Sequence, residues 1–390
     1  MKILVLGAKG FVGKNLVCAL ENIKDGKDRR FPELVIEEVM SYDIDSPYGT
    51  LAKYLSEADF IFNFAGVNRP KDTAEFMAGN CDFLGEVLGI LKDCDNKCPI
   101  VLSSSIQASL TGRFADSAYG LSKKAGEDLL IKYSEDTSAK VMIYRFPNIF
   151  GKWARPNYNS AVATFCHNIA NDLPITVNDE NTELELLYID DLVEEMLLCL
   201  MEKEHRTTKF SRYCSVPVTH KVTLGKIVNL LRAFRSFPNS LMMPSIHKDS
   251  FDYKLFSTYL SYLPGDKAIH GFDTKSDSRG SFTEIMKSID KGQFSVNVSL
   301  PGETKGNHWH HSKWEIFLVV SGKALIKMRK IGEDETIEYE VSGDELKAVY
   351  MLPGYTHSIT NLSQTENLVT LMWANEIFDG NKPDTFFEEV

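Results

Sequence analysis

Two hydrophobic patterns alternate along the first 150 residues of the chain. Short, mostly apolar runs, which are typical of strands buried on both faces, lie at 2–6, 34–42, 59–65, 99–104 and 140–146. Between these runs, apolar residues recur at helical spacing after Gly7 and over 73–92 and 118–134. Strands and helices that alternate at this length predict a parallel sheet with helices on both faces.

The pattern changes after residue 152. An irregular loop over 153–160 precedes three helical patterns, at 161–171, 190–203 and 224–235, which predict a smaller lobe next to the sheet. Beyond Gly271 the helical periodicity disappears. Short β-type runs between turn residues replace it, at 293–300, 315–321, 324–330, 336–341, 347–352, 357–361 and 367–373. Their spacing predicts an antiparallel barrel or sandwich.

The composition is that of a globular protein long enough for two domains, with 390 residues, 43% of them hydrophobic and 25% charged. The net charge of −11 is spread along the chain, which argues against nucleic acid and anionic membranes as partners. We find no signal peptide and no apolar run long enough to span a bilayer, and the seven cysteines have no repeated spacing. We therefore expect free thiols and a cytoplasmic location.

Glycines mark the turn between the first predicted strand and the first predicted helix. Gly7, Gly10 and Gly13 have the spacing of a dinucleotide-binding fingerprint, in the strand–turn–helix context that this fingerprint requires. Glycine permits the tight turn, the close approach of the backbone to a pyrophosphate, and the close packing of helix on sheet. The turn therefore predicts a dinucleotide site.

Tyr119 and Lys123 lie one helical turn apart, so both side chains can face the same cleft. A nearby ammonium favours the tyrosinate, and the tyrosine can then exchange a proton with a substrate oxygen while hydride moves to or from carbon. The serine run 103–105 ends the fourth predicted strand, at the sheet edge where ligands bind. Ser104 or Ser105 can hydrogen-bond the same oxygen, and we favour Ser105.

These features resemble the extended short-chain dehydrogenase/reductase family over residues 1 to about 235, with further matches at 65–67, 145–151 and 188–191. The resemblance implies a Rossmann-type doubly wound sheet and a substrate pocket that includes Asn148 and Arg145. It implies a nicotinamide cofactor held by Gly7, Lys9, Gly10, Phe11, Val12, Gly13, Asp43, Ala65, Gly66, Val67, Asn80, Tyr119 and Lys123. Asp43 follows the second predicted strand, where a carboxylate binds the ribose diol of NAD, whereas Lys9 could pair with the additional phosphate of NADP.

The C-terminal third contains a second set of candidate residues. His308 and His310 are two apart, so on a strand their side chains share a face. Glu315 has the opposite parity, and a bend or bulge must intervene before it can join them. With His357, these three imidazoles and one carboxylate suit Zn, Fe, Mn or Ni. The alternative is a metal-free β domain with structural histidines.

The spacing of these four residues resembles the cupin superfamily. Residues 277–282 also resemble the entry strand of the cupins that epimerise keto-deoxysugar nucleotides, although the ligand set departs from that group. His311, Tyr355 and Glu284 are the candidates for the acid/base residue of the cupin half. No geometric argument from the sequence selects among them. We expect a reductase domain over 1–245, with its Rossmann core to about 150 and a substrate lobe over 151–245. A linker over 246–265 and a cupin barrel over 266–390 would follow.

Over essentially all 390 residues, the chain resembles the bifunctional capsular-polysaccharide enzymes that act in UDP-N-acetyl-L-fucosamine synthesis, most clearly at 103–108, 150–160, 257–264 and 305–311. The resemblance implies that the cupin half, with zinc, epimerises carbon 3 of a UDP-2-acetamido-2,6-dideoxy-4-hexulose. The other half then reduces carbon 4 with NADPH (or NADH) to the L-talose product. A homodimer is expected, since cupins commonly pair. The alternatives are a single-activity 4-ketoreductase with a structural, metal-bound cupin, and a non-catalytic nicotinamide sensor.

Overall fold

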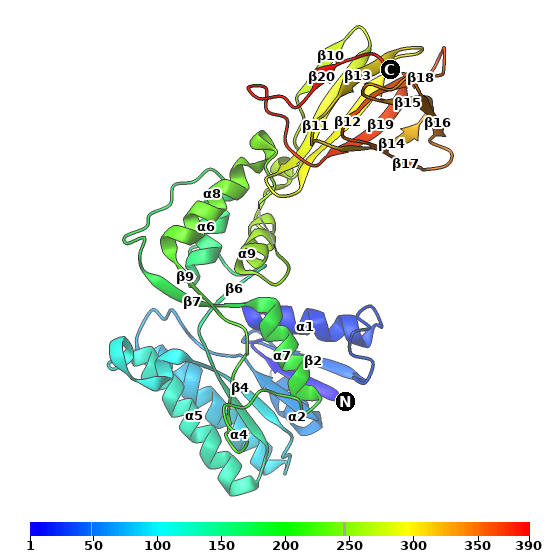
Figure 1. Cartoon of the computed structure of the whole chain (residues 1–390). Helices are drawn as coiled ribbons and strands as arrows, with labels where there is room; N and C mark the ends of the chain where they lie inside the picture. Colours follow the sequence, from blue (N-terminus) through cyan, green and yellow to red (C-terminus); the bar gives the residue numbers. More distant parts are fainter. Residues whose placement is uncertain (48, 245–246) are drawn as a thin grey trace. The chain divides into compact units, whose positions relative to one another are not determined.

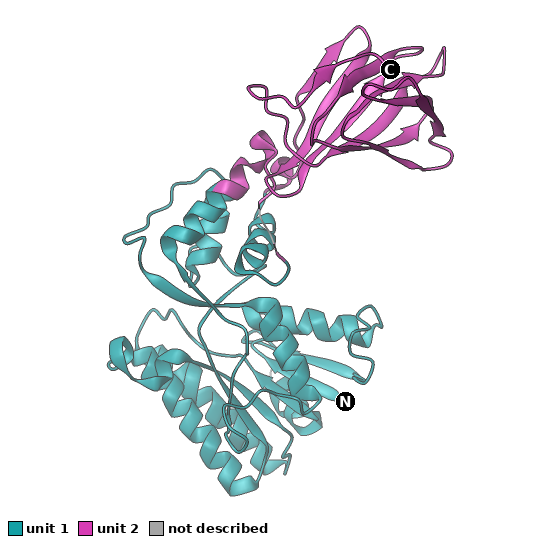
Figure 2. Ribbon diagram, viewed as in Figure 1, with its two compact units in different colours: residues 1–232, 248–263 teal, residues 233–247, 264–390 magenta. Residues whose placement is uncertain are grey.

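The computed structural model describes residues 1–47, 49–244 and 247–390. The chain divides into two compact units (Figure 2), unit 1 with residues 1–232 and 248–263, and unit 2 with residues 233–247 and 264–390. The predicted boundary at 245–246 lies outside the described residues. Within the described ranges, no helix combines the length and the apolar character needed to cross a membrane.

A six-stranded parallel sheet forms the centre of unit 1 (Figure 1). Its strands are, in spatial order, β2 (Glu38–Tyr42), β1 (Lys2–Leu6), β3 (Phe60–Asn63), β4 (Ile100–Ser105), β5 (Val141–Phe146) and β8 (Tyr213–Cys214). The predicted parallel sheet is therefore confirmed. The strand order reverses between β1 and β3, and sheets of this kind bind ligands at such a reversal, beyond the carboxyl ends of the strands.

Helices cover both faces of this sheet, as predicted. Helices α1 (Phe11–Lys24) and α7 (Ile189–Leu200) pack on one face, and α2 (Thr50–Glu57), α4 (Phe83–Asp93) and α5 (Ala118–Thr137) pack on the other. The helix predicted over 73–92 consists of α3 (Ala74–Met77), a π-helical turn η1 (Ala78–Asp82) and α4. Short 3-10 turns η2 (Ile106–Ser109) and η3 (Gly112–Phe114) connect β4 to α5.

A smaller lobe completes unit 1. It contains a three-stranded sheet of β6 (Asn148–Phe150), β7 (Glu183–Tyr188) and β9 (His220–Thr223), with α6 (Ala161–Ala170), the start of α8 (Leu224–Ser240) and α9 (Phe251–Leu260). Helix α9 lies inside the predicted linker range. Phe251, Leu255 and Tyr259 recur every four residues and are buried, and the Lys254 ammonium pairs with Asp191 at 2.6 Å.

Two antiparallel sheets make up most of unit 2. One contains β10 (Thr274–Asp277), β11 (Gly280–Ser288), β12 (Gly292–Ser299), β19 (Leu368–Ala374), β14 (Glu315–Ser321) and β17 (Ala348–Met351). The other contains β16 (Thr336–Ser342), β15 (Lys323–Lys330), β18 (Tyr355–Asn361), β13 (Thr304–Trp309) and β20 (Phe386–Phe387). Side chains of both sheets, such as Phe317 and Ile326, share one apolar core. The predicted closed barrel is not confirmed, because no strand ladder joins the two sheets in the described residues.

Candidate functional site

A cavity of about 690 Å³ lies at the carboxyl edge of the parallel sheet in unit 1. The glycine turn after β1, Gly66 and Val67 after β3, and the serine run at the end of β4 line it, as do Tyr119 and Lys123 of α5. Asn148 and residues of the loop 153–160 line it as well. The cavity therefore brings together most of the residues predicted to bind a cofactor and a substrate in the N-terminal half.

Two glycines of the turn, Gly7 and Gly13, have no space for a side chain. Gly7 has a φ of +76°, and a Cβ atom there would lie 2.7 Å from the main-chain nitrogen of Ala65. A Cβ atom on Gly13 would lie 2.1 Å from the main-chain oxygen of Gly7. Helix α1 begins at Phe11, directly behind the turn, so its unpaired N–H groups are available to an anionic group in the cavity.

Ser105, Tyr119 and Lys123 bring a hydroxyl, a phenol and an amine to one wall of the cavity. Burial raises the pKa of Tyr119 to about 12, and a hydrogen bond with Ser105 opposes that rise. Burial lowers the pKa of Lys123 to about 8, and the negative charge of Glu127 opposes that fall. The Lys123 ammonium lies 5.9 Å from the centre of the Tyr119 ring and donates a hydrogen bond of 3.0 Å to the main-chain oxygen of Ser103.

The two candidate serines have different partners. Ser104 donates a hydrogen bond of 2.5 Å to the buried carboxylate of Glu127, which also accepts hydrogen bonds of 2.8 and 2.6 Å from Arg145. The Ser105 hydroxyl instead meets Tyr119. The geometry therefore favours Ser105 as the hydroxyl that faces a substrate oxygen. Arg145 is turned toward Glu127 and does not line the cavity, so the substrate contact predicted for it has no geometric support.

Asp43 and Asn80 do not line the cavity. Instead, each holds a loop that does. The Asp43 carboxylate accepts the main-chain N–H of Lys9 at 2.8 Å, and the Lys9 ammonium pairs with Asp45 at 2.5 Å. Asn80 holds Val67 through hydrogen bonds of 2.9 and 3.0 Å to its main-chain oxygen and nitrogen. Both predicted cofactor residues thus position backbone groups next to the cavity.

The charges that line the cavity all have one sign. Among the described residues, its lining contains Lys9, Lys14, Arg113, Lys123 and Arg155 but no Asp or Glu. Since the whole chain carries a charge of −11, this positive surface is a local feature, and it favours a ligand with several phosphates. The sequence did not single out Arg113 and Arg155, because both lie in loops whose position over the cavity depends on distant contacts.

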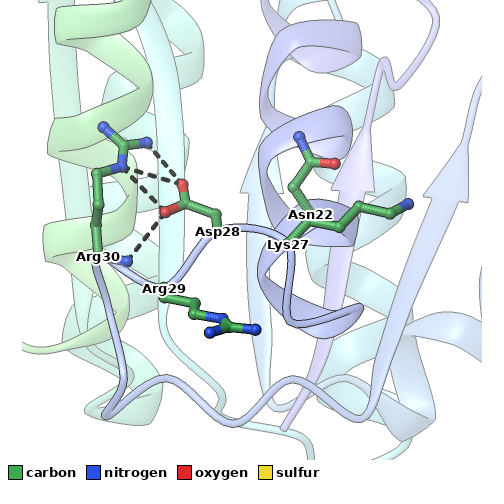
Figure 3. Close-up of a pocket in the computed structure, with 5 residues that line it drawn as sticks. All are labelled: Asn22, Lys27, Asp28, Arg29 and Arg30. Atoms are coloured by element: carbon green, nitrogen blue, oxygen red, sulfur yellow. Dashed lines mark hydrogen bonds and ion pairs between the residues drawn. The ribbon is translucent and has the colours of Figure 1, made fainter. Parts of the chain in front are cut away.

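A second hollow in unit 1 lies beyond the end of α1 (Figure 3). Asn22 and residues 27–30 line it. The Arg30 guanidinium there is paired with the Asp28 carboxylate at 2.6 Å, and Lys27 pairs with Asp25 at 2.8 Å. These exposed ion pairs are ordinary surface contacts, and they give the hollow no group suited to catalysis.

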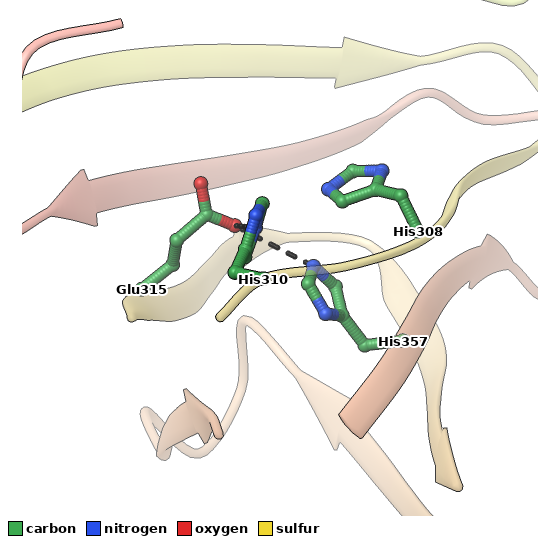
Figure 4. Close-up of side chains that lie close together, drawn as sticks. All are labelled: His308, His310, Glu315 and His357. Carbon is green, nitrogen blue, oxygen red and sulfur yellow. Dashed lines mark ion pairs between the residues drawn. The ribbon is translucent and has the colours of Figure 1, made fainter. Parts of the chain in front are cut away.

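In unit 2, four predicted ligands lie close together. His308, His310, Glu315 and His357 each bring one ligand atom to within 4.8 Å of the others (Figure 4). The Glu315 Oε2 atom lies 3.7 Å from His310 Nε2 and 3.5 Å from His357 Nε2, and all three atoms are buried without a hydrogen-bond partner in the described structure. Because buried polar atoms are nearly always partnered, these atoms fit a divalent metal ion.

Outer contacts hold these ligands in orientation. A main-chain carbonyl can only accept, so His310 donates its Nδ1–H to the oxygen of Asp384 and presents Nε2 to the cluster. The Asp384 carboxylate accepts the main-chain N–H groups of 311–313, which confirms the bend expected between His310 and Glu315. Burial opposes ionisation of Glu315, but the neighbouring imidazoles and Lys313, at 2.8 Å, hold its pKa well below its usual value.

The remaining candidates of unit 2 occupy different positions. Burial lowers the pKa of His308 to about 4, so its imidazole is neutral and can act as a ligand at pH 7. The His311 ring packs against Trp309, with ring centres 4.5 Å apart, and Tyr355 packs against the apolar core. Glu284 lines a cavity of about 230 Å³ together with Glu315.

Comparison with known proteins gives matches over both halves of the chain. Residues 3–210 match the NAD dependent epimerase/dehydratase family, and residues 275–386 match the polysaccharide biosynthesis C-terminal domain. A UDP-2-acetamido-2,6-beta-L-arabino-hexul-4-ose reductase of Pseudomonas aeruginosa is 40% identical over 386 residues, which cover 99% of this chain and 98% of the relative.

Solved structures agree with these matches. The capsular polysaccharide assembling protein CapF from Staphylococcus aureus is similar over 100% of both chains, with a TM-score of 0.89 and 46% identity. A UDP-glucuronic acid 4-epimerase from Bacillus cereus in complex with NAD covers 67% of this chain and 96% of its own, with a TM-score of 0.51 and 18% identity, and shares the fold alone. The chain therefore belongs to the NAD dependent epimerase/dehydratase family, among the capsular-polysaccharide enzymes that also carry the polysaccharide biosynthesis C-terminal domain.

Proposed function

We propose that this protein is a bifunctional nucleotide-sugar enzyme of capsule synthesis. On this proposal, unit 2 inverts carbon 3 of a UDP-2-acetamido-2,6-dideoxy-4-hexulose, and unit 1 reduces carbon 4 to give UDP-2-acetamido-2,6-dideoxy-L-talose. The observation that carries it is the hydroxyl–phenol–amine wall of a positively lined cavity, in a chain that also holds a cluster of metal-type ligands. The similarity to the P. aeruginosa relative, which is a reductase of a UDP-linked hexul-4-ose, supports the substrate class.

In the reductase half, we assign the proton to Tyr119. Its phenol would protonate the carbon-4 oxygen as the ketone becomes an alcohol, while Ser105 holds the same oxygen by a hydrogen bond. The charge of Lys123 would lower the free energy of the tyrosinate that results. NADPH, when bound, supplies the hydride for carbon 4. Asn148, which lines the cavity, would contact the sugar.

We propose NADPH as the reductant, with NADH as the alternative. Both oxygens of the Asp43 carboxylate already accept main-chain N–H groups, from Lys9 at 2.8 Å and Ile44 at 2.9 Å. Asp43 does not line the cavity, whereas Lys14, Arg113 and Arg155 do, and these cations favour the additional phosphate of NADPH. The ratio of the NADPH and NADH dissociation constants measures this preference.

For unit 2, we propose a metal-bearing cupin domain over 266–390, which follows a linker over 246–265 and a reductase domain over 1–245. Two packed antiparallel sheets are also the architecture of cupin jelly rolls. His308, His310, Glu315 and His357 would hold the ion, for which we propose zinc. A bound divalent ion would stabilise negative charge on the ketone oxygen during epimerisation. We further propose a homodimer, because cupin domains commonly form dimers. We also propose a cytoplasmic location, because the cysteines show no disulfide-like spacing.

A second candidate function is a 4-ketoreductase whose metal-bound unit 2 serves folding and assembly only. The ligand count favours it, since four protein ligands complete the tetrahedral shell of a structural zinc site, whereas catalytic sites leave a position open. The two candidates differ in whether carbon 3 exchanges its hydrogen.

The deciding experiment follows NADPH and NADH oxidation with UDP-2-acetamido-2,6-dideoxy-4-hexulose in D2O. It uses the wild type, Tyr119→Phe and His357→Ala. In the wild type we expect cofactor oxidation and deuterium at carbon 3 of the product. In Tyr119→Phe we expect exchange of the carbon-3 hydrogen without cofactor oxidation. In His357→Ala we expect neither exchange nor cofactor oxidation from the unepimerised substrate. Oxidation by the wild type without deuterium at carbon 3 would favour the simple ketoreductase. No oxidation with either cofactor would exclude both candidates.

A further inference from the structure

The cavity beside the metal-type cluster in unit 2 has the lining of a sugar site. Aromatic side chains and neutral hydrogen-bonding side chains meet there, namely Phe282, Gln293, Ser295 and Phe378. A sugar ring has apolar C–H faces and a hydroxylated edge, so it needs both kinds of group. Glu315 belongs to both the cavity and the cluster, so a ring in this cavity would lie next to the metal-type ligands.

The interior of unit 2 is polar on the side of this cavity. The inward residues of β12 are Gln293, Ser295, Asn297 and Ser299, and none is more than 6% exposed. The apolar core draws instead on β14 to β19. Burial of polar groups is unfavourable unless they are hydrogen-bonded. Gln293 donates to the Ser295 hydroxyl and Asn297 to the Ser299 hydroxyl, each at 3.2 Å, so this polar face is stable as it stands. Through Gln293 and Ser295 it gives the cavity neutral hydrogen-bonding groups of the kind that sugar hydroxyls need.

Glu284 faces this cavity from β11. It lies opposite Ser295, whose side chain is buried, and residues opposite each other on antiparallel strands point to the same face. A bulge follows between Glu284 and Met286, and it brings Lys287 opposite the buried Gln293.

The bulge also creates an ion pair. In a regular strand, Glu284 and Lys287 are three positions apart and would point to opposite faces. With one additional residue between them they share the interior face, and the Lys287 ammonium lies 2.7 Å from a Glu284 carboxylate oxygen. The strand irregularity thus holds a carboxylate in place at the cavity.

The other charged residues of the cavity are less suited to act on a ligand. Lys313 pairs with Glu315 at 2.8 Å, and Glu315 belongs to the metal-type cluster. Lys275 and Glu376 are exposed to solvent, whereas the Glu284 side chain is only 19% exposed. Strands β12 and β19 separate β11 from β14, which places the two backbones roughly 14 Å apart. The cavity that Glu284 and Glu315 both line has a volume of about 230 Å³, which is enough for one pyranose ring.

We propose that Glu284 is the catalytic base that removes the carbon-3 proton; this inference rests on the epimerase activity proposed above. Glu284 takes the proton, and the C–H electron pair becomes the carbon 3–carbon 4 double bond of an enolate with its charge on the ketone oxygen. Water on the opposite face returns a proton to carbon 3 as that electron pair re-forms a C–H bond. Glu284 then gives its proton to the hydroxide that remains. Carbon 3 is inverted, and nothing is oxidised or reduced.

The test compares metal-loaded wild type, Glu284→Gln and Glu284→Asp. Without NADPH, NMR in D2O follows carbon-3 exchange of UDP-2-acetamido-2,6-dideoxy-4-hexulose. General-base catalysis contributes about 10²–10⁴-fold, so Glu284→Gln should lose at least about 100-fold in exchange rate, and Glu284→Asp should retain part of it. Glu338→Gln is the matched control, because Glu338 also pairs with a lysine, Lys327 at 2.6 Å, but lies outside the cavity lining.

Two further readouts separate a chemical role from a structural one. Glu284→Gln should keep its metal content and should reduce a pre-epimerised 4-keto substrate with NADPH at the wild-type rate. If the wild type exchanges the carbon-3 hydrogen and Glu284→Gln does so at the same rate, the role of Glu284 is overturned and the epimerase proposal stays intact. Loss of metal or of reduction in Glu284→Gln would overturn it as well, because the residue would then be structural. Absence of exchange in the wild type itself would instead refute the epimerase function.

Discussion

Replacing Lys123 by methionine should stabilise unit 1 at neutral pH, although it removes a residue of the proposed reductase site. Burial lowers the pKa of Lys123 from its ordinary value of 10.5 to about 8. This difference corresponds to about 3 kcal/mol of folding free energy lost at pH 7, where the buried amine must be charged. Loss of the hydrogen bond to the Ser103 main-chain oxygen offsets about 1 kcal/mol. We therefore expect Lys123→Met to be more stable than the wild type by about 2 kcal/mol at pH 7.

The sign of the pH dependence follows from the direction of the shift. Between pH 8 and 10.5, Lys123 holds its proton in the unfolded chain and has lost it in the folded one. The wild type therefore gains stability as the pH rises through this interval. The advantage of Lys123→Met should fall by about 3 kcal/mol between pH 7 and pH 10.5.

Urea denaturation of both proteins across this pH range measures the difference. Trp153 is the only tryptophan of residues 1–232 and 248–263, so its fluorescence reports unit 1 once the tryptophans at 309, 314 and 373 are replaced by phenylalanine. Subtraction of the two curves cancels the titrating groups that do not interact with Lys123. A variant that is less stable at pH 7, or a difference that does not change with pH, would refute the reasoning.

Three further predictions follow from the two sites. Gly13→Ala should weaken NADPH binding at least about 100-fold in a fluorescence titration, because its Cβ would lie 2.1 Å from a main-chain oxygen of the turn. Ser105→Ala should lower the rate of NADPH oxidation about 100-fold with little change in stability. Ser104→Ala should cost about 1–3 kcal/mol in urea denaturation, since it removes one of the hydrogen bonds to the buried, charged carboxylate of Glu127. Glu315→Gln should lose bound metal after dialysis, as measured by elemental analysis, and a metal-replete variant would contradict the ligand assignment.

The sequence predicts the parallel half of the fold well because its strands are buried on both faces and read as continuous apolar runs. Helix α9 escaped prediction for a local reason. Phe251, Leu255 and Tyr259 do have helical spacing, but Lys254 lies among them, and its burial depends on an ion pair with the distant Asp191. The hydrophobic pattern did not show strands β10 and β11, since β11 is half-buried at every position and β10 is exposed, so neither shows alternation. Only the family resemblance of residues 277–282 indicated a strand there.

The candidate site residues divide in the same way. The cluster in unit 2 could be predicted because His308 and His310 are two residues apart at the end of β13 and the bend to Glu315 is short. The charges around the first cavity could not, because Arg113 and Arg155 reach it from separate loops. The choice between Ser104 and Ser105 also needed coordinates, since neighbouring residues on a strand point to opposite sides.

Each cavity is lined by residues of one unit alone, and this has a consequence for genetics. A substitution in one site leaves the groups of the other in place. Two inactive full-length proteins, such as Tyr119→Phe and His357→Ala, should therefore restore product formation when mixed, provided that the epimerised ketone passes through solution. Capsule-deficient alleles would then form two complementation groups, one for each site. In a cell that expresses one allele of each group, the amounts of the two activities could be varied independently.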